Sequence, residues 1–535
     1  MKKIALLLIG LTFTMQAQTQ STDYLKKAKE LVSKMTLEEK ASLCSGETAW
    51  STQAIKRLGI PSIFMTDGPH GLRKAEGFDF TNSVPSTCFP TASSLASSWD
   101  PKLAQKMGEA LGIEAQANDV QIVLGPGVNM KRSPLGGRNF EYFSEDPILA
   151  GKIAISFING VQSQGVGTSM KHFAANSQEF ERMSNNSVVD ERTLNEIYFP
   201  AFEMAVKEAQ PWTVMCSYNR FNGIYASENP YLLHQMLKEK WGLKGFVVSD
   251  WGAVNERAAG VAAGLHLEMP SSGGANNLKV IAAVKNGTLS ESRLDEIISE
   301  LVAVTLKAKD SHKKGIVVNK VKHHELARQI SGECIVLLKN DNAILPLQPQ
   351  LKKIAIIGDF AKTPRYQGAG SSQVRPTQIA NALEELQKLA KGTQFSFSSG
   401  YTPTGDTDAA KIAEAVQNAK EADVAIVFAG LPDIYESEGY DRKNIDMPEG
   451  HNQLIAEVAK VNKNVIVVLM NGAAVSMPWK NDVKAIVEAY LGGQAGGGAV
   501  ADVLTGKVNP SGKLSETFPV RTEDTPTATD FHSKD

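Results

Sequence analysis

The chain has 535 residues and a mass of 57.7 kDa, more than one ordinary domain requires, so two or three domains are expected. Hydrophobic residues make up 42% and charged residues 21%, which is typical of soluble globular proteins and excludes a disordered or fibrous chain. The 56 basic and 58 acidic residues give a formal net charge of -2, so there is no basic field for nucleic acid. The substrate is therefore expected to be small or uncharged.

Residues 1–17 are predicted to form a secretory signal peptide. Lys2 and Lys3 precede an apolar run from 4 to 13, and Ala17 provides a small-residue cleavage site. The run is about half as long as the roughly 20 apolar residues that a membrane-spanning helix needs. No later segment reaches that length, so membrane insertion is not expected, and the mature protein is expected to be exported, either periplasmic or secreted.

Residues 24–310 are predicted to form the first domain, a (β/α)8-like barrel. Short apolar or β-branched runs alternate there with amphipathic stretches, the pattern of repeated βα units around a parallel sheet. Thr36 and Glu39 have the spacing of a capping box, which predicts the start of the first helix.

Polar side chains follow several of the strand-like runs in this domain. An aspartate after a strand is more often a helix cap or a turn residue when it stands alone. Repetition of the pattern favours a functional site, because βα barrels carry their active sites at the carboxyl ends of the strands. The residues placed in this way are Asp67, Lys171, His172, Tyr218, Asp250 and Trp251.

The pattern changes after residue 310. Residues 311–324 are rich in Lys and His and weakly periodic, as expected for a solvated linker. Residues 325–520 contain nearly continuous apolar runs separated by helical patterns, which predicts a doubly wound α/β sandwich domain with a buried parallel sheet. Residues 521–535 are predicted to be a polar tail.

No cofactor or metal is expected. The glycine-rich stretch 490–504 lacks the GK[ST] and GxGxxG patterns, so it is interpreted as close backbone packing rather than a nucleotide site. The four cysteines include no CxxC pair, and no histidine cluster has metal-ligand spacing. Whether Cys44 and Cys88 form a disulfide bond is left open. A GxSxG elbow is absent, so serine hydrolase chemistry has no support.

Asp250 precedes a tryptophan that could stack on the apolar face of a sugar ring, which suits a nucleophile of glycoside cleavage. Such cleavage needs a second carboxylic acid, and the acidic cluster 435–442 after a second-domain strand supplies candidates. Crowding of Glu436, Glu438 and Asp441 is expected to raise their pKa values, as a general acid requires. Standing alone, this cluster would be interpreted as a solvated surface loop.

Four basic side chains could donate hydrogen bonds to sugar hydroxyls, although each can also be explained as a surface or ion-pair group. One of them, Lys171, could instead form a Schiff base and make the barrel an aldolase-like enzyme. The four are Arg138, Lys171, His172 and Arg182.

Several long motifs follow one another along the chain. They are TDGPHGLRK at 66–74, GPGVNMKRSPLGGRNFEYFSEDP at 125–147, KHFAANSQEFERM at 171–183, GFVVSDWGA at 245–253, LLKNDNAILPL at 337–347, YESEGYDR at 435–442 and LTGKVNPSGKLSETFP at 504–519. Together they resemble glycoside hydrolase family 3. The resemblance covers nearly the whole chain after the predicted signal peptide, in order.

The resemblance implies a barrel-like first domain and an α/β sandwich second domain that hold a sugar between them, with retention at the anomeric carbon. Asp250 matches the family's nucleophile. Glu438 matches the acid/base of the β-glucosidase branch, and Glu436 is a competitor for that role. The residues that match the family's contacts with the nonreducing glucosyl unit are Asp67, Arg138, Lys171, His172, Arg182, Tyr218 and Trp251.

The implied function is hydrolysis of the terminal nonreducing β-D-glucosyl unit of oligosaccharides or glucosides by double displacement. Asp67 in TDGP resembles glucosidase members more than xylosidase members. The alternatives are a β-xylosidase or mixed-specificity β-glycosidase, and a catalytically inactive sugar-binding paralogue. The partner is thus a small carbohydrate, and the oligomeric state is left open.

Two departures from the family pattern lead to further expectations. His266 stands where members usually have aspartate, and it is expected to alter the charge near the barrel mouth. The sequence ends at residue 535, and no C-terminal fibronectin type III-like domain is expected.

Overall fold

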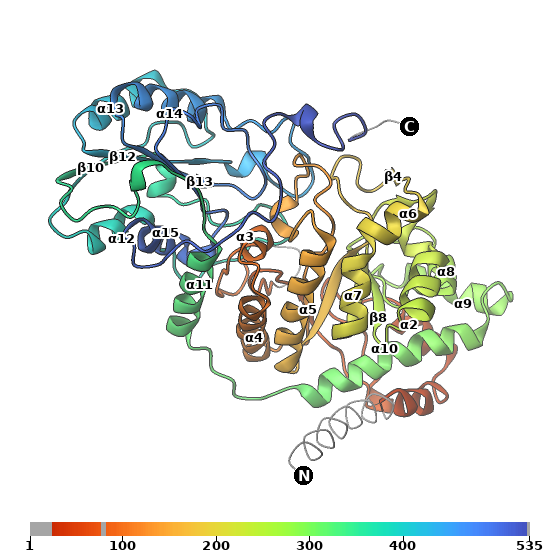
Figure 1. Ribbon diagram of the computed structural model, residues 1–535. Coiled ribbons are helices and arrows are strands. Elements are labelled where there is room, and N and C mark those ends of the chain that lie inside the picture. The colour runs from red at the N-terminus through yellow and green to blue at the C-terminus, as the bar shows by residue number, and fades with distance from the viewer. Residues whose placement is uncertain (1–23, 76–81, 532–535) are drawn as a thin grey trace, which may run out of the picture.

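The structure is a computed structural model that describes residues 24–75 and 82–531. The predicted signal peptide, residues 1–17, lies outside these ranges. Figure 1 shows two domains, with the first at the lower right and the second at the upper left. No helix in the described ranges has the length and apolar character to cross a membrane.

The first domain is built around a parallel sheet of five strands in the order β1-β2-β3-β5-β8. The strands are β1 (Met65–Asp67), β2 (Ile122–Leu124), β3 (Gly167–Phe173), β5 (Thr213–Cys216) and β8 (Phe246–Ser249). Short bridged segments close this sheet into a ring, so the predicted barrel is present in an irregular form. The bridges pair Val248 with Leu267, Glu268 with Ser45, Gly46 with Thr52, and Ser51 with Phe64.

Helices surround this ring, and their starts follow local rules. Asp100 and Asp146 cap α4 and α5, and each of these helices begins with proline. Proline is tolerated there because its fixed φ suits a helix and the first turn does not need its N–H. The predicted capping box of Thr36 and Glu39 is confirmed. The helices are α2 (Leu37–Leu43), α3 (Ala92–Ser97), α4 (Pro101–Ala117), α5 (Pro147–Ser163), α6 (Glu191–Thr193), α7 (Pro200–Ala209), α8 (Arg257–Ala263), α9 (Ala275–Lys285) and α10 (Glu291–Ser311), with π-helical η3 (Leu194–Tyr198) and η5 (Tyr231–Lys240).

The second domain contains a six-stranded sheet in the order β11-β10-β12-β13-β14-β9, in which only the edge strand β9 is antiparallel. This confirms the predicted doubly wound α/β sandwich. The strands are β9 (Val336–Asn340), β10 (Lys353–Ile357), β11 (Gln394–Ser398), β12 (Val424–Gly430), β13 (Val465–Met470) and β14 (Ala485–Glu488). A small third sheet, attached to the barrel domain, contains β4 (Asn186–Ser187), β6 (Arg220–Phe221) and β7 (Ile224–Tyr225).

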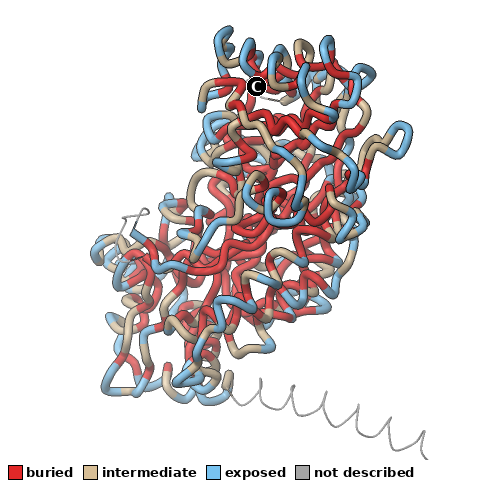
Figure 2. Tube along the Cα trace, turned by 90° about the vertical axis from the view of Figure 1, so that its left-hand side faces the viewer, coloured by how far each residue is buried: buried red, intermediate tan, exposed pale blue. Residues whose placement is uncertain are grey.

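Helices cover both faces of the second-domain sheet because successive strand residues point to opposite sides. In β10, Ile354 and Ile356 face the core beneath α12 and α15, whereas Ala355 and Ile357 face the core beneath α13 and α14. Figure 2 shows buried residues running through both domains. The helices are α12 (Ala382–Leu389), α13 (Ala409–Lys420), α14 (Glu449–Val461) and α15 (Gly496–Leu504).

The predicted linker, 311–324, needs a correction at its end. Helix α11 (Lys320–Cys334) begins within it, because Asn319 accepts a hydrogen bond from the Lys322 N–H and caps the helix. His323 is buried and lies 2.6 Å from a carboxylate oxygen of Glu114 in α4. The solvated connection therefore spans 312–319, and α11 packs against the barrel domain.

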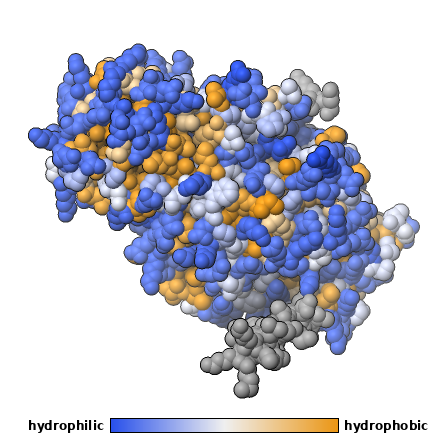
Figure 3. Space-filling model, in the orientation of Figure 1, coloured by the Kyte–Doolittle hydropathy of each residue, from blue (hydrophilic) through white to orange (hydrophobic). Residues whose placement is uncertain are grey.

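The glycine-rich stretch that leads into α15 is closely packed, as predicted. A Cβ atom on Gly493 would lie 2.4 Å from the backbone of Phe89, and one on Gly497 would lie 2.4 Å from the Ala380 carbonyl oxygen. The polar tail also returns to the barrel domain, where the Thr527 hydroxyl donates to the Arg132 carbonyl at 3.1 Å. Figure 3 shows hydrophilic residues over most of the visible face and hydrophobic ones gathered over part of the second domain.

Candidate active site

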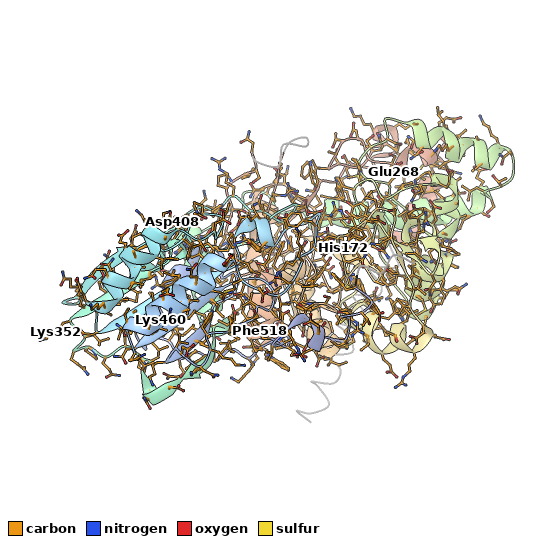
Figure 4. All side chains as sticks on the ribbon, turned by 90° about the horizontal axis from the view of Figure 1, so that it is seen from above. His172, Glu268, Lys352, Asp408, Lys460 and Phe518 are labelled. Atoms are coloured by element: carbon orange, nitrogen blue, oxygen red, sulfur yellow. The ribbon has the colours of Figure 1, made fainter. Side chains whose placement is uncertain are left out.

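The predicted barrel-domain residues converge at one edge of the parallel sheet. Asp67 ends β1, Lys171 and His172 lie near the end of β3, and Asp250 directly follows β8. Parallel strands present their carboxyl ends at the same edge, which explains the convergence. Figure 4 shows His172 near the middle of the molecule, where the two domains meet.

Asp250 is buried, and its two oxygens have different surroundings. Oδ1 accepts a hydrogen bond from the Trp251 N–H at 2.7 Å, and Oδ2 lies 3.6 Å from Nε2 of His172. Burial raises the pKa of Asp250, and the charge of Glu438 raises it further, while Arg138 and Lys171 oppose this rise. The carboxylate is thus held between cations without a direct ion pair to either one.

His172 is a neutral neighbour of Asp250. Burial lowers the pKa of His172 well below its usual value, and the cations Arg138 and Lys171 lower it further. The Tyr142 hydroxyl lies 3.1 Å from Nδ1, and the backbone N–H donates to the Asn129 side chain at 2.7 Å. The ring is therefore fixed on both sides, and its Nε2 faces Asp250.

Lys171 is a buried cation between two carboxylates. Its Nζ lies 3.1 Å from Oε1 of Glu141 and 3.5 Å from Oδ1 of Asp67. Burial disfavours the charge, but Glu141 and Asp67 outweigh it and raise the pKa of Lys171. A Schiff base requires a neutral amine, so this environment argues against the aldolase-like alternative. Asp67 is also paired with the fully buried Arg73.

Glu438 reaches this group of residues from the second domain, on the loop between β12 and α14. Oε1 lies 2.7 Å from Nη1 of Arg182 and 3.6 Å from Nη1 of Arg138. Oε2 accepts a hydrogen bond from the Ser371 N–H at 2.7 Å. By contrast, both oxygens of Glu436 accept from the Gly472 N–H, at 3.0 and 2.9 Å, inside the second domain.

The predicted pKa effect of crowding is wrong for Glu438. Burial alone would raise its pKa, but Arg138 and Arg182 hold it well below the usual range. Burial does raise the pKa of Glu436. The difference arises because the nearest charged groups to Glu438 are arginines of the other domain rather than acids of its own loop.

Aromatic rings line one side of the cluster. The Trp251 ring lies 5.1 Å from the Trp50 ring, and its Nε1–H donates to the Ala49 carbonyl at 2.9 Å. The Tyr218 hydroxyl donates to the Trp251 carbonyl at 3.1 Å, and the guanidinium of Arg182 lies 5.0 Å from the centre of the Tyr218 ring. These contacts fix both side chains beside Asp250.

His266 does not change the charge at this edge, contrary to expectation. Its Nδ1 accepts from the Val247 N–H at 3.1 Å, near the start of β8, and its Nε2 lies 2.7 Å from Glu300. Burial lowers the pKa of His266 to about 4, so it is neutral at pH 7. Lys238 completes the contact with Glu300 at 2.5 Å. His266 therefore belongs to a buried structural group at the opposite end of β8 from Asp250.

Neither a metal site nor a disulfide bond is present in the described ranges. No group of His, Cys, Asp and Glu in 24–75 or 82–531 has the arrangement of metal ligands. Cys44 and Cys88 are separate buried thiols, and burial raises the pKa of both. The side chains that the structure brings together in this cluster are carboxylates, basic groups and aromatic rings.

Two protein-family models match the chain. The glycosyl hydrolase family 3 N-terminal domain matches residues 18–304, and the family 3 C-terminal domain matches residues 335–535. The chain belongs to glycoside hydrolase family 3. It is therefore a glycoside hydrolase, with the arrangement of two domains described above.

Relatives of this glycoside hydrolase include enzymes of two specificities. It is 55% identical over 514 residues to thermostable β-glucosidase B of Acetivibrio thermocellus, covering 95% of this chain and 68% of the relative. It is 48% identical to an exo-α-(1→6)-L-arabinopyranosidase of Bifidobacterium longum, covering 92% of this chain and 67% of the relative.

Solved structures of family 3 enzymes have the same fold. A β-glucosidase of Bifidobacterium adolescentis gives a TM-score of 0.90 at 48% identity, covering 94% of this chain and 73% of that one. β-Glucosidase 3B of Thermotoga neapolitana in complex with glucose gives a TM-score of 0.86 at 35% identity, covering 94% of this chain and 77% of that one.

Several residues of the glycoside hydrolase's site were not singled out from the sequence. Glu141 joins Arg138 to Lys171, with 2.8 Å from its Oε2 to the guanidinium and 3.1 Å from its Oε1 to the ammonium. Glu179 lies 2.9 Å from Arg182. Both acids fall within the motifs at 125–147 and 171–183, but spacing alone does not show which way a side chain points. Ser371, on a second-domain loop, carries no sequence signal.

Proposed function

We propose that the protein is a retaining β-glucosidase with Asp250 as nucleophile and Glu438 as acid/base. The observation that supports this most directly is that Glu438, from the second domain, lies in contact with Arg182 of the barrel domain and influences the pKa of Asp250. Glycoside cleavage uses a pair of carboxyl groups at one bond, and Asp250 and Glu438 would supply that pair from the two domains. Glu436 is directed elsewhere, which favours Glu438.

In the first step, an oxygen of Asp250 attacks the anomeric carbon of the bound sugar. The glycosidic bond breaks, the leaving oxygen takes a proton from Glu438, and a glycosyl ester on Asp250 remains. His172 is fixed beside Asp250 in its neutral form, so it donates no full positive charge that would weaken the nucleophile. The cations Arg138 and Lys171 oppose the rise that burial causes in the pKa of Asp250, which favours the ionised nucleophile.

In the second step, Glu438 removes a proton from water, which attacks the anomeric carbon and releases Asp250. The ionised state favoured by Arg138 and Arg182 suits Glu438 as this base. The first step needs a proton on the same group. Bound substrate must therefore raise the pKa of Glu438. This occurs if sugar hydroxyl groups accept hydrogen bonds from Arg138 and Arg182 and so weaken the contact of both arginines with Glu438.

The ion pairs at the cluster also define what the sugar must offer. Asp67 and Glu141 are acceptors, and Lys171 and Arg138 are donors, all held in fixed positions by mutual contacts. Nη1 of Arg138 makes no hydrogen bond to any group in the described part of the chain, although it is buried. Such a donor is suited to a hydroxyl group of an uncharged sugar.

A second candidate function is a mixed specificity that includes α-L-arabinopyranosides, because the Bifidobacterium longum relative carries that name at 48% identity. Hydrolysis of p-nitrophenyl β-D-glucopyranoside, β-D-xylopyranoside and α-L-arabinopyranoside by the purified protein separates these specificities. We expect the highest kcat/KM on the glucoside. A higher value on either other substrate would replace the proposed specificity.

The catalytic roles are tested with Asp250→Asn, Glu438→Gln and the matched variant Glu436→Gln. Asp250→Asn should abolish turnover of the glucoside. Glu438→Gln should slow substrates with poor leaving groups far more than activated ones, because only the former need a proton. If Glu436→Gln shows that pattern instead, the acid/base assignment moves to Glu436. Proton NMR of the first glucose anomer released should show the β form, and an initial α form would contradict retention.

We further propose that residues 1–17 direct export to the periplasm or beyond, on the strength of their charge and apolar pattern. When the full chain is expressed in a Gram-negative bacterium, intact-mass measurement of the exported protein should show loss of this segment. Retention of the segment on a cytoplasmic protein would contradict the proposal.

A further inference from the structure

The loop that carries Glu438 is joined to the barrel domain by reciprocal hydrogen bonds. Asp441, on that loop, accepts from the backbone N–H groups of Gly137 at 2.8 Å, Glu179 at 2.9 Å and Phe180 at 2.8 Å. In return, Oε2 of Glu179 accepts from the Gly439 N–H of the loop at 2.8 Å. Each segment therefore supplies a carboxylate to the backbone of the other.

The backbones of the two segments are in direct contact at this point. A Cβ atom on Gly137 would lie 1.8 Å from the Tyr440 carbonyl oxygen and 2.6 Å from the Ser437 carbonyl oxygen. One residue beyond Asp441, the Arg442 N–H donates to the Leu135 carbonyl at 2.8 Å. Only a glycine at 137 permits this approach, so the contact is specific to these two segments.

Glu438 lies between the residues that make this contact. On its other side, its N–H donates to the Ala369 carbonyl at 3.1 Å, and its Oε2 accepts from the Ser371 N–H. Glu179 also lies 2.9 Å from the Nη1 of Arg182 that contacts Glu438. The orientation of Glu438 therefore depends on both of its neighbouring segments.

We propose that Asp441 and Glu179 are positioning residues that hold Glu438 in place for proton transfer at the sugar. We call this pair and its backbone partners the interdomain clasp. The proposal rests on the proposed acid/base role of Glu438. Neither carboxylate of the clasp needs to touch the substrate, because each acts on the loop or on Arg182. Loss of the clasp should impair proton transfer more than it impairs binding or nucleophilic attack.

The test compares two glucosides that differ in their need for a proton. Phenyl β-D-glucoside has a poor leaving group, phenolate, which requires acid assistance. The dinitrophenolate of 2,4-dinitrophenyl β-D-glucoside departs without it. The variants are Asp441→Asn and Glu179→Gln, with Glu438→Gln as reference. Asp433→Asn is the matched control, an exposed acid on the same loop that pairs with Arg365 of the second domain.

We expect Asp441→Asn and Glu179→Gln each to lower kcat/KM on phenyl glucoside by about tenfold or more, a part of the 100-fold to 10,000-fold effect of general acid catalysis. On dinitrophenyl glucoside, kcat/KM should change by less than about threefold by the same reasoning. Combining either change with Glu438→Gln should add no further loss on phenyl glucoside, because the acid is already absent. Asp433→Asn should behave as wild type.

Equal losses on the two glucosides in both variants, each assayed well below its melting temperature, would overturn the positioning role. If Asp441→Asn does not fold, Glu179→Gln decides, since it keeps an acceptor for the Gly439 N–H and removes only the charge beside Arg182. Failure of the underlying function gives a different result. In that case Glu438→Gln itself shows no dependence on the leaving group.

Discussion

Three carboxylates of the candidate site differ in pKa because each has different neighbours. Burial raises the pKa of Asp250, whereas two arginines lower that of Glu438. Burial raises the pKa of Glu179 to about 7, although Arg138 and Arg182 oppose it. Residue type and burial alone would predict a raised pKa for all three carboxylates. The charged groups in contact with each one therefore decide whether its pKa is raised or lowered.

The raised pKa of Glu179 predicts a pH dependence of stability. Between its ordinary value of 4.5 and about 7, the folded protein binds more protons at this site than the unfolded chain does. The contribution of Glu179 to stability is therefore present below pH 4.5 and lost as pH rises through 7. The Glu179→Gln variant cannot titrate at this position, so its stability does not fall in this way. The free energy of unfolding of the variant minus that of wild type should therefore increase by up to about 3 kcal/mol as pH rises from 4.5 to 7.

Urea denaturation at several pH values between 4.5 and 7.5 measures this difference. Glu181→Gln, an exposed acid two residues away, is the matched control. It should leave the pH dependence of unfolding unaltered. A constant difference between Glu179→Gln and wild type across the window would show that Glu179 does not titrate there.

At the scale of elements, long apolar runs were predictable and short pairings were not. Strands β3 and β8 lie among the apolar runs predicted within 24–310, and β12 and β13 among the nearly continuous runs predicted within 325–520. Strand β2 has only three residues, too few to show a period, and the bridges that close the barrel pair residues far apart in the chain. Such contacts depend on the completed fold, so local patterning carries no sign of them.

The sequence predicted which residues gather at the candidate site, but not the pKa shifts that their neighbours cause. Strand ends and family motifs identified the residues that the structure brings together, from Asp67 to Trp251, and their catalytic roles stay predictions. The lowered pKa of Glu438 was not predictable, because it requires knowing that Arg138 and Arg182 reach across from the other domain. Contacts between loops of two domains leave no periodic signal in either one.

The close contact at Gly137 predicts the effect of one added methyl group. In Gly137→Ala, the Cβ would meet the Tyr440 carbonyl oxygen at 1.8 Å, so the loop that carries Glu438 must move. We expect kcat/KM on phenyl β-D-glucoside to fall by about tenfold or more, as general acid assistance is lost. Steady-state kinetics of the purified variant provide the measurement.

Gly332→Ala is the control for this change. Gly332 lies within α11, and its added Cβ would approach the Val508 side chain no closer than 3.4 Å, an ordinary contact. This variant should keep full activity and gain up to about 1 kcal/mol of stability from helix propensity. Wild-type kinetics in Gly137→Ala would contradict the prediction, because the loop that carries Glu438 would then accommodate the added methyl group without losing acid assistance.

At the scale of the whole molecule, a buried ion pair links the two domains. Nζ of Lys131, in the barrel domain, lies 2.8 Å from Oε1 of Glu516, at the end of the second domain. Their side chains are 1% and 3% exposed. Removal of one partner leaves a buried charge uncompensated, so the domains should depend on this contact to stay docked.

Lys131→Met should therefore lower the free energy of unfolding by about 3 to 5 kcal/mol. Differential scanning calorimetry checks this, and separation into two transitions would be the sign that the domains unfold independently. Lys207→Met is the control, because Lys207 pairs with Glu203 at 2.5 Å on the surface. Its expected cost is below about 1 kcal/mol. Equal costs for the two variants would contradict a role for the buried pair in domain docking.

As the proposed nucleophile, Asp250 should form a covalent bond to the sugar during turnover. Incubation with 2,4-dinitrophenyl 2-deoxy-2-fluoro-β-D-glucoside should trap this ester, because the fluorine slows its hydrolysis. Peptide mass spectrometry should then place one fluoroglucosyl group on Asp250. A label on another residue would contradict the assignment, and rapid hydrolysis of β-glucosides by a protein that forms no adduct would contradict the retaining mechanism.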